Sequence, residues 1–116
     1  MILRTSFLAS PHMLRPMIMA YLLIVTACGG PPPADATGAE IYQQLCSNCH
    51  GDDLSGGLGV PIGAGSNSAS QDDEFLVLTV ERGRGRMPSF DSTLTDDQIL
   101  RVVEFVRDQQ KAGEPD

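Results

Sequence analysis

The feature that most constrains the fold of this chain is a cluster of two thiols and one imidazole within five residues, Cys46-Ser-Asn-Cys49-His50. The rest of the chain is poor in core-forming side chains. Of its 116 residues only six are aromatic, none is tryptophan, and twenty are glycine or proline. A small domain of this composition usually needs a covalent staple, a metal or a cofactor to be stable. The cluster is the expected site of that support.

Several chemistries use paired cysteines at this spacing. A thioredoxin-like redox pair is expected in a βαβ context, which the sequence does not show. A zinc site needs further ligands, and there is no second Cys pair. A plain disulfide would leave His50 without a role. Cys-x-x-Cys-His is the attachment signature of c-type haem, in which two thiols reach two vinyl groups of one porphyrin and the histidine ligates the iron. We therefore predict one covalently attached haem c (iron) per chain.

Residues 1–27 read as an export signal. They contain no acid, and Arg4 and Arg15 precede an apolar run over residues 17–27. Eleven residues are too few to span a bilayer as a helix, which takes about 20. A basic flank followed by a short apolar stretch is typical of a signal peptide. Translation could begin at Met1 or at Met13.

The end of this segment, Val25-Thr-Ala-Cys28, resembles the lipobox of bacterial lipoproteins, in which the cysteine becomes the lipidated first residue. Acylation of Cys28 would account for the odd cysteine of an exported chain. The alternatives are cleavage near Ala27 with Cys28 as a spare thiol, and an uncleaved anchor. The Pro-rich residues 28–37 are expected to form an extended tether, in which the nine residues after Cys28 reach up to about 28 Å at ~3.1 Å per residue.

Removal of residues 1–27 leaves 89 residues and shifts the net charge from −7 to −9, because two arginines and no acids are lost. Such acidity disfavours direct nucleic-acid binding. One histidine, His50, and one methionine, Met87, remain. The two are therefore the candidate ligands of the haem iron.

The remaining sequence predicts helices. Residues 38–47 and 95–111 carry apolar residues at helical spacing, and Thr95-Asp-Asp-Gln98 is a capping box. The apolar run within 71–82 fits a strand or a buried helix. The acids at its start, with Ser70 three residues before Asp73, favour the helix. Residues 51–69 are predicted to be a long loop and residues 112–116 a short tail, so the folded domain is expected to span 38–111.

On these residues the chain resembles class I c-type cytochromes. The resemblance implies a small all-α fold of three to four helices wrapped around one haem, with the first and last helices crossing where Gly38 and Tyr42 meet Val102 and Phe105. In that family a methionine in a loop before the C-terminal helix is the second axial ligand, and Met87 matches it. The family also has a proline after the Cys-x-x-Cys-His motif whose carbonyl accepts the imidazole N–H. Here Pro61 fills that position, although the family more often has glycine before the proline.

Arg82, Arg84 and Arg86 form the basic cluster of an otherwise acidic chain. They could dock a partner at the haem edge or pair with the haem propionates. Alternatively, they belong to a solvated turn balanced by nearby acids.

Iron held by a histidine and a methionine has no open coordination position, which predicts one-electron transfer and no enzymatic activity of its own. The alternative is a haem-based sensor or weak peroxidase in which the methionine is displaced. The expected partners are a donor and an acceptor protein, such as an oxidase or dehydrogenase complex in a respiratory or dehydrogenase-linked chain. Haem attachment and acylation together predict a lipid-anchored protein facing the periplasm or cell exterior, on the inner or the outer membrane.

Overall fold

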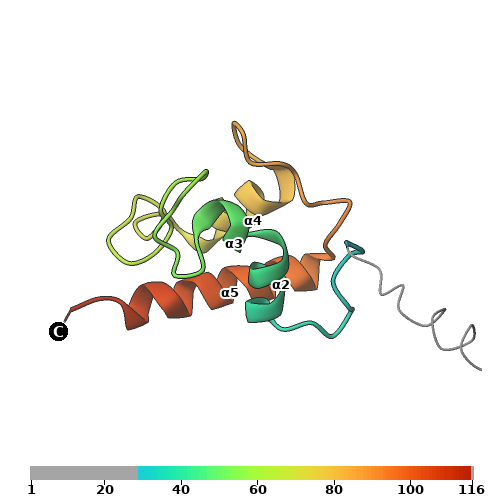
Figure 1. Ribbon diagram of the computed structural model, residues 1–116, viewed down its shortest axis with the longest axis horizontal. Helices are drawn as coiled ribbons and strands as arrows, with labels where there is room; N and C mark the ends of the chain where they lie inside the picture. The colour runs from blue at the N-terminus through green and yellow to red at the C-terminus, as the bar shows by residue number, and fades with distance from the viewer. Residues whose placement is uncertain (1–28, 116) are drawn as a thin grey trace, which may run out of the picture. The chain divides into compact units, whose positions relative to one another are not determined.

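The computed structural model describes residues 29–115, and the predicted signal segment and Cys28 lie outside this range. Two units are distinguished, Met1–Gly30 and Pro31–Asp116, and the second contains all of the described helices (Figure 1). Its elements are α2 (Gly38–Leu45), α3 (Ser47–His50), α4 (Asp73–Arg82) and α5 (Asp96–Ala112). Within residues 29–115 there is no strand, only an isolated bridge between Arg84 and Met87. The predicted all-α fold is confirmed.

Side-chain caps define where the three longer helices begin. Thr37 and Glu40 form a capping box at the start of α2, and Thr95 and Gln98 form the predicted one at the start of α5. The Asp72 side chain caps α4 by accepting from the Phe75 N–H at 2.7 Å. Residues 73–82 thus form a helix and not a strand, as predicted for the segment 71–82.

The start of α4 corrects one detail of the prediction. Ser70 lies two residues before the observed cap, and its hydroxyl donates to the Asn67 carbonyl at 2.8 Å. A carboxylate at the cap position accepts an N–H bond and also complements the positive end of the helix dipole, so Asp72 is the better cap.

The crossing of α2 and α5 forms the centre of the domain (Figure 1). Gly38 permits it, because a Cβ at this position would overlap the Arg101 carbonyl of α5. The Tyr42 ring packs on Phe105 with ring centroids 5.3 Å apart, and Tyr42 and Val102 are among the most buried side chains. The crossing inferred from the family resemblance is therefore present.

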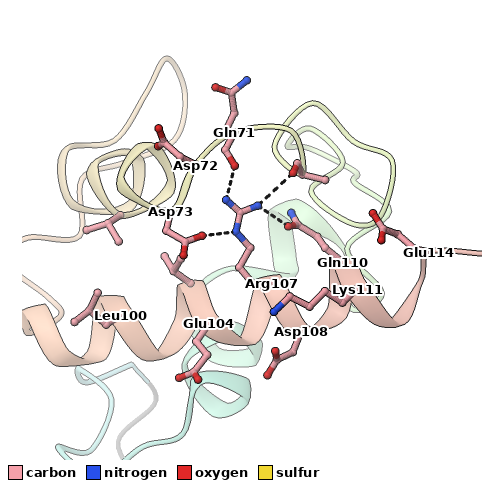
Figure 2. A pocket seen from close by; sticks show the side chains of 13 residues that line it. Gln71, Asp72, Asp73, Leu100, Glu104, Arg107, Asp108, Gln110, Lys111 and Glu114 are labelled. Carbon is pink, nitrogen blue, oxygen red and sulfur yellow. Dashed lines mark hydrogen bonds and ion pairs between the residues drawn. The ribbon is translucent and has the colours of Figure 1, made fainter.

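The long loop between α3 and α4 is fixed to α5 by two side chains. The guanidinium of Arg107 donates to the backbone carbonyls of Ser68, Ala69 and Gln71 and pairs with Asp73 at 2.7 Å (Figure 2). Gln110 is buried and donates to the Ile62 carbonyl at 2.8 Å. These bonds give a loop without regular structure a defined path.

The predicted tether is shorter than expected, because residues 31–37 belong to the folded unit. Pro32 and Ala36 are buried. Gln98 of α5 donates to the Pro33 carbonyl at 2.9 Å, and Arg101 donates to the Ala34 carbonyl at 2.8 Å. Prolines have no N–H of their own to satisfy, so α5 side chains can hold this segment through its carbonyls. The predicted start of the domain at residue 38 is therefore too late.

None of the helices in the described part of the chain is long and apolar enough to cross a membrane.

Candidate haem site

The Cys-x-x-Cys-His motif forms one helical turn directly after α2. Cys46 ends α2 by donating its N–H to the Tyr42 carbonyl at 2.8 Å, and its own carbonyl accepts from the N–H groups of Cys49 and His50. The three side chains are therefore held on one turn by backbone bonds. Neither Cys46 nor Cys49 forms a disulfide.

The two thiols differ in environment. Cys46 is half-buried and Cys49 is exposed. Burial, together with the neighbouring Cys49, raises the pKa of the Cys46 thiol to about 11. Cys46 is therefore a neutral thiol at neutral pH, unlike the low-pKa thiolate of a dithiol redox site.

His50 has a fixed ring orientation. Its Nδ1 lies 2.8 Å from the Val60 carbonyl oxygen, which can only accept a hydrogen bond, so Nδ1 carries the proton. Nε2 is consequently the nitrogen with a free lone pair, as a metal ligand requires. Gly59 allows the approach, since a Cβ there would lie 3.2 Å from the ring atoms Nδ1 and Cε1.

The carbonyl that holds the imidazole is thus that of Val60, whereas Pro61 was predicted to provide it. The chain turns away after Pro61, because the N–H groups of Ile62 and Gly63 both donate to the Leu54 carbonyl. A residue before proline is restricted to extended conformations, which presets the Val60 peptide. Pro61 therefore influences His50 indirectly, because it restricts the backbone of Val60, whose carbonyl contacts the imidazole.

Met87 lies in a tight loop that folds back on the end of α4. Arg84 and Met87 exchange two backbone hydrogen bonds of 3.0 Å across Gly85, which has φ +60°. Gly83 makes the loop possible: it has φ +73°, and a Cβ there would lie 2.6 Å from the Met87 carbonyl oxygen. The close approach concerns Gly83 alone, since nothing lies within 4 Å of a Cβ at Gly85.

A cavity of about 540 Å³ brings the predicted residues together, since Cys46, His50 and Met87 all line it. Helices α2, α4 and α5 contribute most of the apolar wall, and the loop before α4 contributes polar side chains. The apolar wall residues from the helices are Tyr42, Phe75, Leu76, Val80, Val102, Val103 and Val106. The polar residues from the loop are Asn67, Ser68, Ser70 and Gln71.

This cavity fits the predicted cofactor. Its volume is within the range of small-molecule and cofactor sites, and it is mainly apolar with a few placed polar groups. An imidazole nitrogen with a free lone pair, a thioether sulfur and a thiol are the donor set that covalent His/Met-ligated haem requires. Cys49 and Pro61 are not among its lining residues; Cys49 lies one residue before His50 on the same turn.

A second hollow, of about 810 Å³, lies between the start of α4 and the outer face of α5 (Figure 2). Charged and polar side chains form most of its wall, and the described residues there include no Cys, His or Met. It therefore offers no iron ligand.

The sequence reasoning did not assign the wall that the loop before α4 contributes. Residues 67–71 are small and polar without periodicity, and only the unusual length of the loop indicated a functional role.

The chain is similar in sequence and in fold to known c-type cytochromes. Residues 33–106 match the family described as "Cytochrome C oxidase, cbb3-type, subunit III". Cytochrome c6 of Leptolyngbya boryana is 31% identical over 81 residues, which cover 67% of this chain and 95% of the relative. The solved c-type cytochrome KustC0563 superimposes with a TM-score of 0.59 at 26% identity, covering 65% of this chain and 99% of that one. The c-type cytochrome NirC gives a TM-score of 0.54 at 30% identity over 61% of this chain and 85% of its own.

The chain therefore belongs to the cytochrome c family, in the group described by the cbb3-type subunit III domain. It is a small monohaem c-type cytochrome with covalently attached haem c, and it acts in electron transfer.

Proposed function

We propose that this protein carries one electron at a time between two partner proteins, using a haem held by four residues of the cavity region. Cys46 and Cys49 would hold the haem by two thioether bonds, each formed by addition of one S–H across one vinyl group. His50 through Nε2 and Met87 through its sulfur would bind the iron. When bound, the haem iron supplies the chemistry by cycling between the ferrous and ferric states.

The observation that carries this proposal is the 2.8 Å contact between His50 Nδ1 and the Val60 carbonyl oxygen, at a cavity that Met87 also lines. A carbonyl can only accept, so this contact places the proton on Nδ1 and leaves Nε2 free to bind iron. The valines of α5 and the aromatic and aliphatic residues of α4 give the same space an apolar wall that would limit contact of a bound haem with water. A shielded, six-coordinate iron changes its solvation little on oxidation, which suits a carrier.

The test is the visible spectrum and carbon monoxide binding of the purified protein. We expect a covalent haem whose ferric form shows the charge-transfer absorption of methionine-ligated iron and whose ferrous form does not take up carbon monoxide at neutral pH. A Met87→Ala variant should lose that absorption and bind carbon monoxide readily. Ready binding by the wild type would instead support the sensor or peroxidase alternative, and a colourless protein would contradict the proposal.

We propose further that Cys28 is acylated and tethers the protein to a bacterial membrane, facing the periplasm or cell exterior. The lipobox-like sequence supports this proposal. The partners are redox proteins, with an oxidase or a dehydrogenase complex as the expected acceptor or donor; the description of the matching family favours the oxidase. Pull-down of the tethered protein from detergent-solubilised membranes tests this assignment, and recovery of no redox protein would contradict it.

A further inference from the structure

The structure separates the three arginines of the basic cluster. Arg84 lines the 540 Å³ cavity together with His50 and Met87. All three are exposed, but neither Arg82, at the end of α4, nor Arg86, in the turn after Arg84, is among the lining residues of the cavity. The three residues therefore have different surroundings, although they alternate regularly in the sequence.

Arg84 is held at the cavity by two contacts. Its guanidinium carbon lies 5.1 Å from the centroid of the Phe75 ring, which also lines the cavity, and its backbone is bonded twice to Met87. Two other arginines of the domain have carboxylate partners, Arg101 with Asp97 and Arg107 with Asp73. Within residues 29–115 Arg84 forms no such ion pair, so its charge is not neutralised by the protein.

The charge distribution around the cavity favours an anion there. The described residues that line it include Arg84 but no aspartate or glutamate, although the whole chain has 15 acidic residues. A carboxylate placed in a largely apolar space requires a partner charge or hydrogen-bond donors to offset its desolvation. Haem carries two propionate carboxylates, and an arginine guanidinium fits the carboxylate geometry.

We propose that Arg84 is the counter-ion of one haem propionate, which rests on the haem site proposed above. Arg82 and Arg86 then belong to the solvated turn. A positive charge held beside the haem favours the ferrous state, which carries one positive charge fewer than the ferric state. Arg84 thus raises the reduction potential of the haem in addition to any contribution from the Met87 ligand.

The experiment compares the reduction potentials of the wild type and of Arg84→Gln, Arg84→Lys and Arg86→Gln at one pH and ionic strength. We expect Arg84→Gln to shift the ferrous/ferric equilibrium towards ferric by on the order of three- to tenfold, since partial solvent screening limits the effect. Arg84→Lys should stay close to the wild type because it keeps the charge. Arg86→Gln, its neighbour outside the cavity, should also stay close. Redox-difference infrared spectra should show a shifted propionate carboxylate band in Arg84→Gln alone.

Two outcomes would overturn the proposal while leaving the haem site intact. In the first, Arg84→Gln retains the His/Met spectrum but changes the potential and the carboxylate band no more than Arg86→Gln. In the second, Arg84→Lys lowers the potential as much as Arg84→Gln, so that packing on Phe75 and not charge is responsible. Absence of covalent haem or of a His/Met spectrum in the wild type would instead contradict the proposed function itself.

Discussion

At the scale of single residues, Gly83 controls whether Met87 can occupy its observed position. A side chain at Gly83 would meet the Met87 carbonyl at 2.6 Å and the Pro88 and Ser89 backbone at 2.7 Å, and no rotation of a side chain can relieve a clash with backbone. Gly85 has a similar positive φ, but nothing lies within 4 Å of its Cβ position. The two glycines thus form a matched pair in one loop.

We predict that Gly83→Ala abolishes methionine ligation, seen as loss of the charge-transfer absorption, and lowers stability by more than the backbone strain alone. Gly85→Ala should keep the absorption and lose only the roughly 1–2 kcal/mol of a left-handed non-glycine residue. Thermal denaturation measures the stability of both. Equal effects of the two substitutions would show that backbone strain, and not the clash with Met87, is what matters.

Tyr42 makes the stability of the protein sensitive to alkaline pH. Its hydroxyl donates to the Gly51 carbonyl at 2.6 Å, and burial is the main cause that raises its pKa to about 12 from an ordinary value of 10, with the nearby Asp52 and Asp53 carboxylates adding to it. A group whose pKa is raised by folding contributes its full stabilisation below the unfolded pKa. The contribution is then lost as the pH rises from about 10 to about 12, because the unfolded chain ionises first.

We predict that Tyr42→Phe removes this part of the alkaline loss of stability, while costing about 1 kcal/mol at neutral pH through the lost hydrogen bond to the Gly51 carbonyl. That carbonyl keeps its longer bond from the Leu54 N–H, at 3.3 Å. Denaturant unfolding followed by far-ultraviolet circular dichroism between pH 9 and 12 measures both effects. Tyr42 is the only tyrosine after residue 27, so the comparison is clean. Parallel pH curves for the two proteins would contradict the assignment.

At the scale of elements, α5 uses two arginines in the same way on two different segments. Arg101 donates to the carbonyls of Ala34 and Ala36 in the N-terminal segment, which does not line the cavity. Arg107 donates to carbonyls of residues 68–71, which form part of the cavity wall. Its side chain is 15% exposed, and Figure 2 shows its guanidinium pointing from α5 towards Gln71. Arg107 therefore positions the loop beside the haem.

We predict that Arg107→Gln and Arg101→Gln both destabilise the fold, each by about 1–3 kcal/mol through unpaired carbonyls. Only Arg107→Gln should also change the haem absorption and reduction potential, because only its loop borders the cofactor. Thermal melts and potentiometric titration of the two variants separate the roles. Unchanged haem properties in Arg107→Gln would show that the loop keeps its position without the clamp.

Sequence patterns predicted the helices well where local chemistry decides the structure. The Thr95 capping box and the apolar spacing after it placed α5 correctly. The place of Gly38 at the helix crossing came from the family resemblance and is also present in the structure. Contacts between residues far apart in the sequence could not be predicted. These contacts decide which carbonyl faces His50 and which segment α5 holds. The Val60 carbonyl, and not that of Pro61, faces His50, because the backbone after Pro61 is bonded to the Leu54 carbonyl. Gln98 and Arg101 donate to carbonyls of residues 33–36, which lie about 65 positions earlier in the chain. No local period encodes such pairings.

At the scale of the whole molecule, the haem is expected to be part of the core. Without the haem, the apolar side chains of α2, α4 and α5 that line the cavity would be left facing water. A small domain with so few other core residues would lose a large share of its hydrophobic stabilisation.

We therefore predict that a Cys46→Ala/Cys49→Ala variant, produced without covalent haem, shows much less helix by circular dichroism and no cooperative melt. Single-cysteine variants that retain haem through one thioether should keep both. A double variant without haem that melts cooperatively at the temperature of the wild type would show that the protein core is sufficient.

The short segment between Cys28 and the folded unit determines how far the domain can lie from a membrane if Cys28 is acylated. Because residues 31–37 are packed on α5, only three peptide units separate Cys28 from the folded unit, and they reach about 10 Å at ~3.3–3.6 Å each. The sequence alone had suggested a spacer of about 28 Å. An acylated Cys28 would thus hold the domain close to the bilayer and limit its partners to membrane proteins. We expect mass spectrometry to find an acylated Cys28 at the N-terminus, and Cys28→Ser to move the protein from the membrane to the soluble fraction with an unchanged haem spectrum. Insertion of ten Gly/Ser residues after Gly30 should leave anchoring intact and alter only the rate of reduction by membrane partners. A wild type found unacylated in the soluble fraction would contradict the tether.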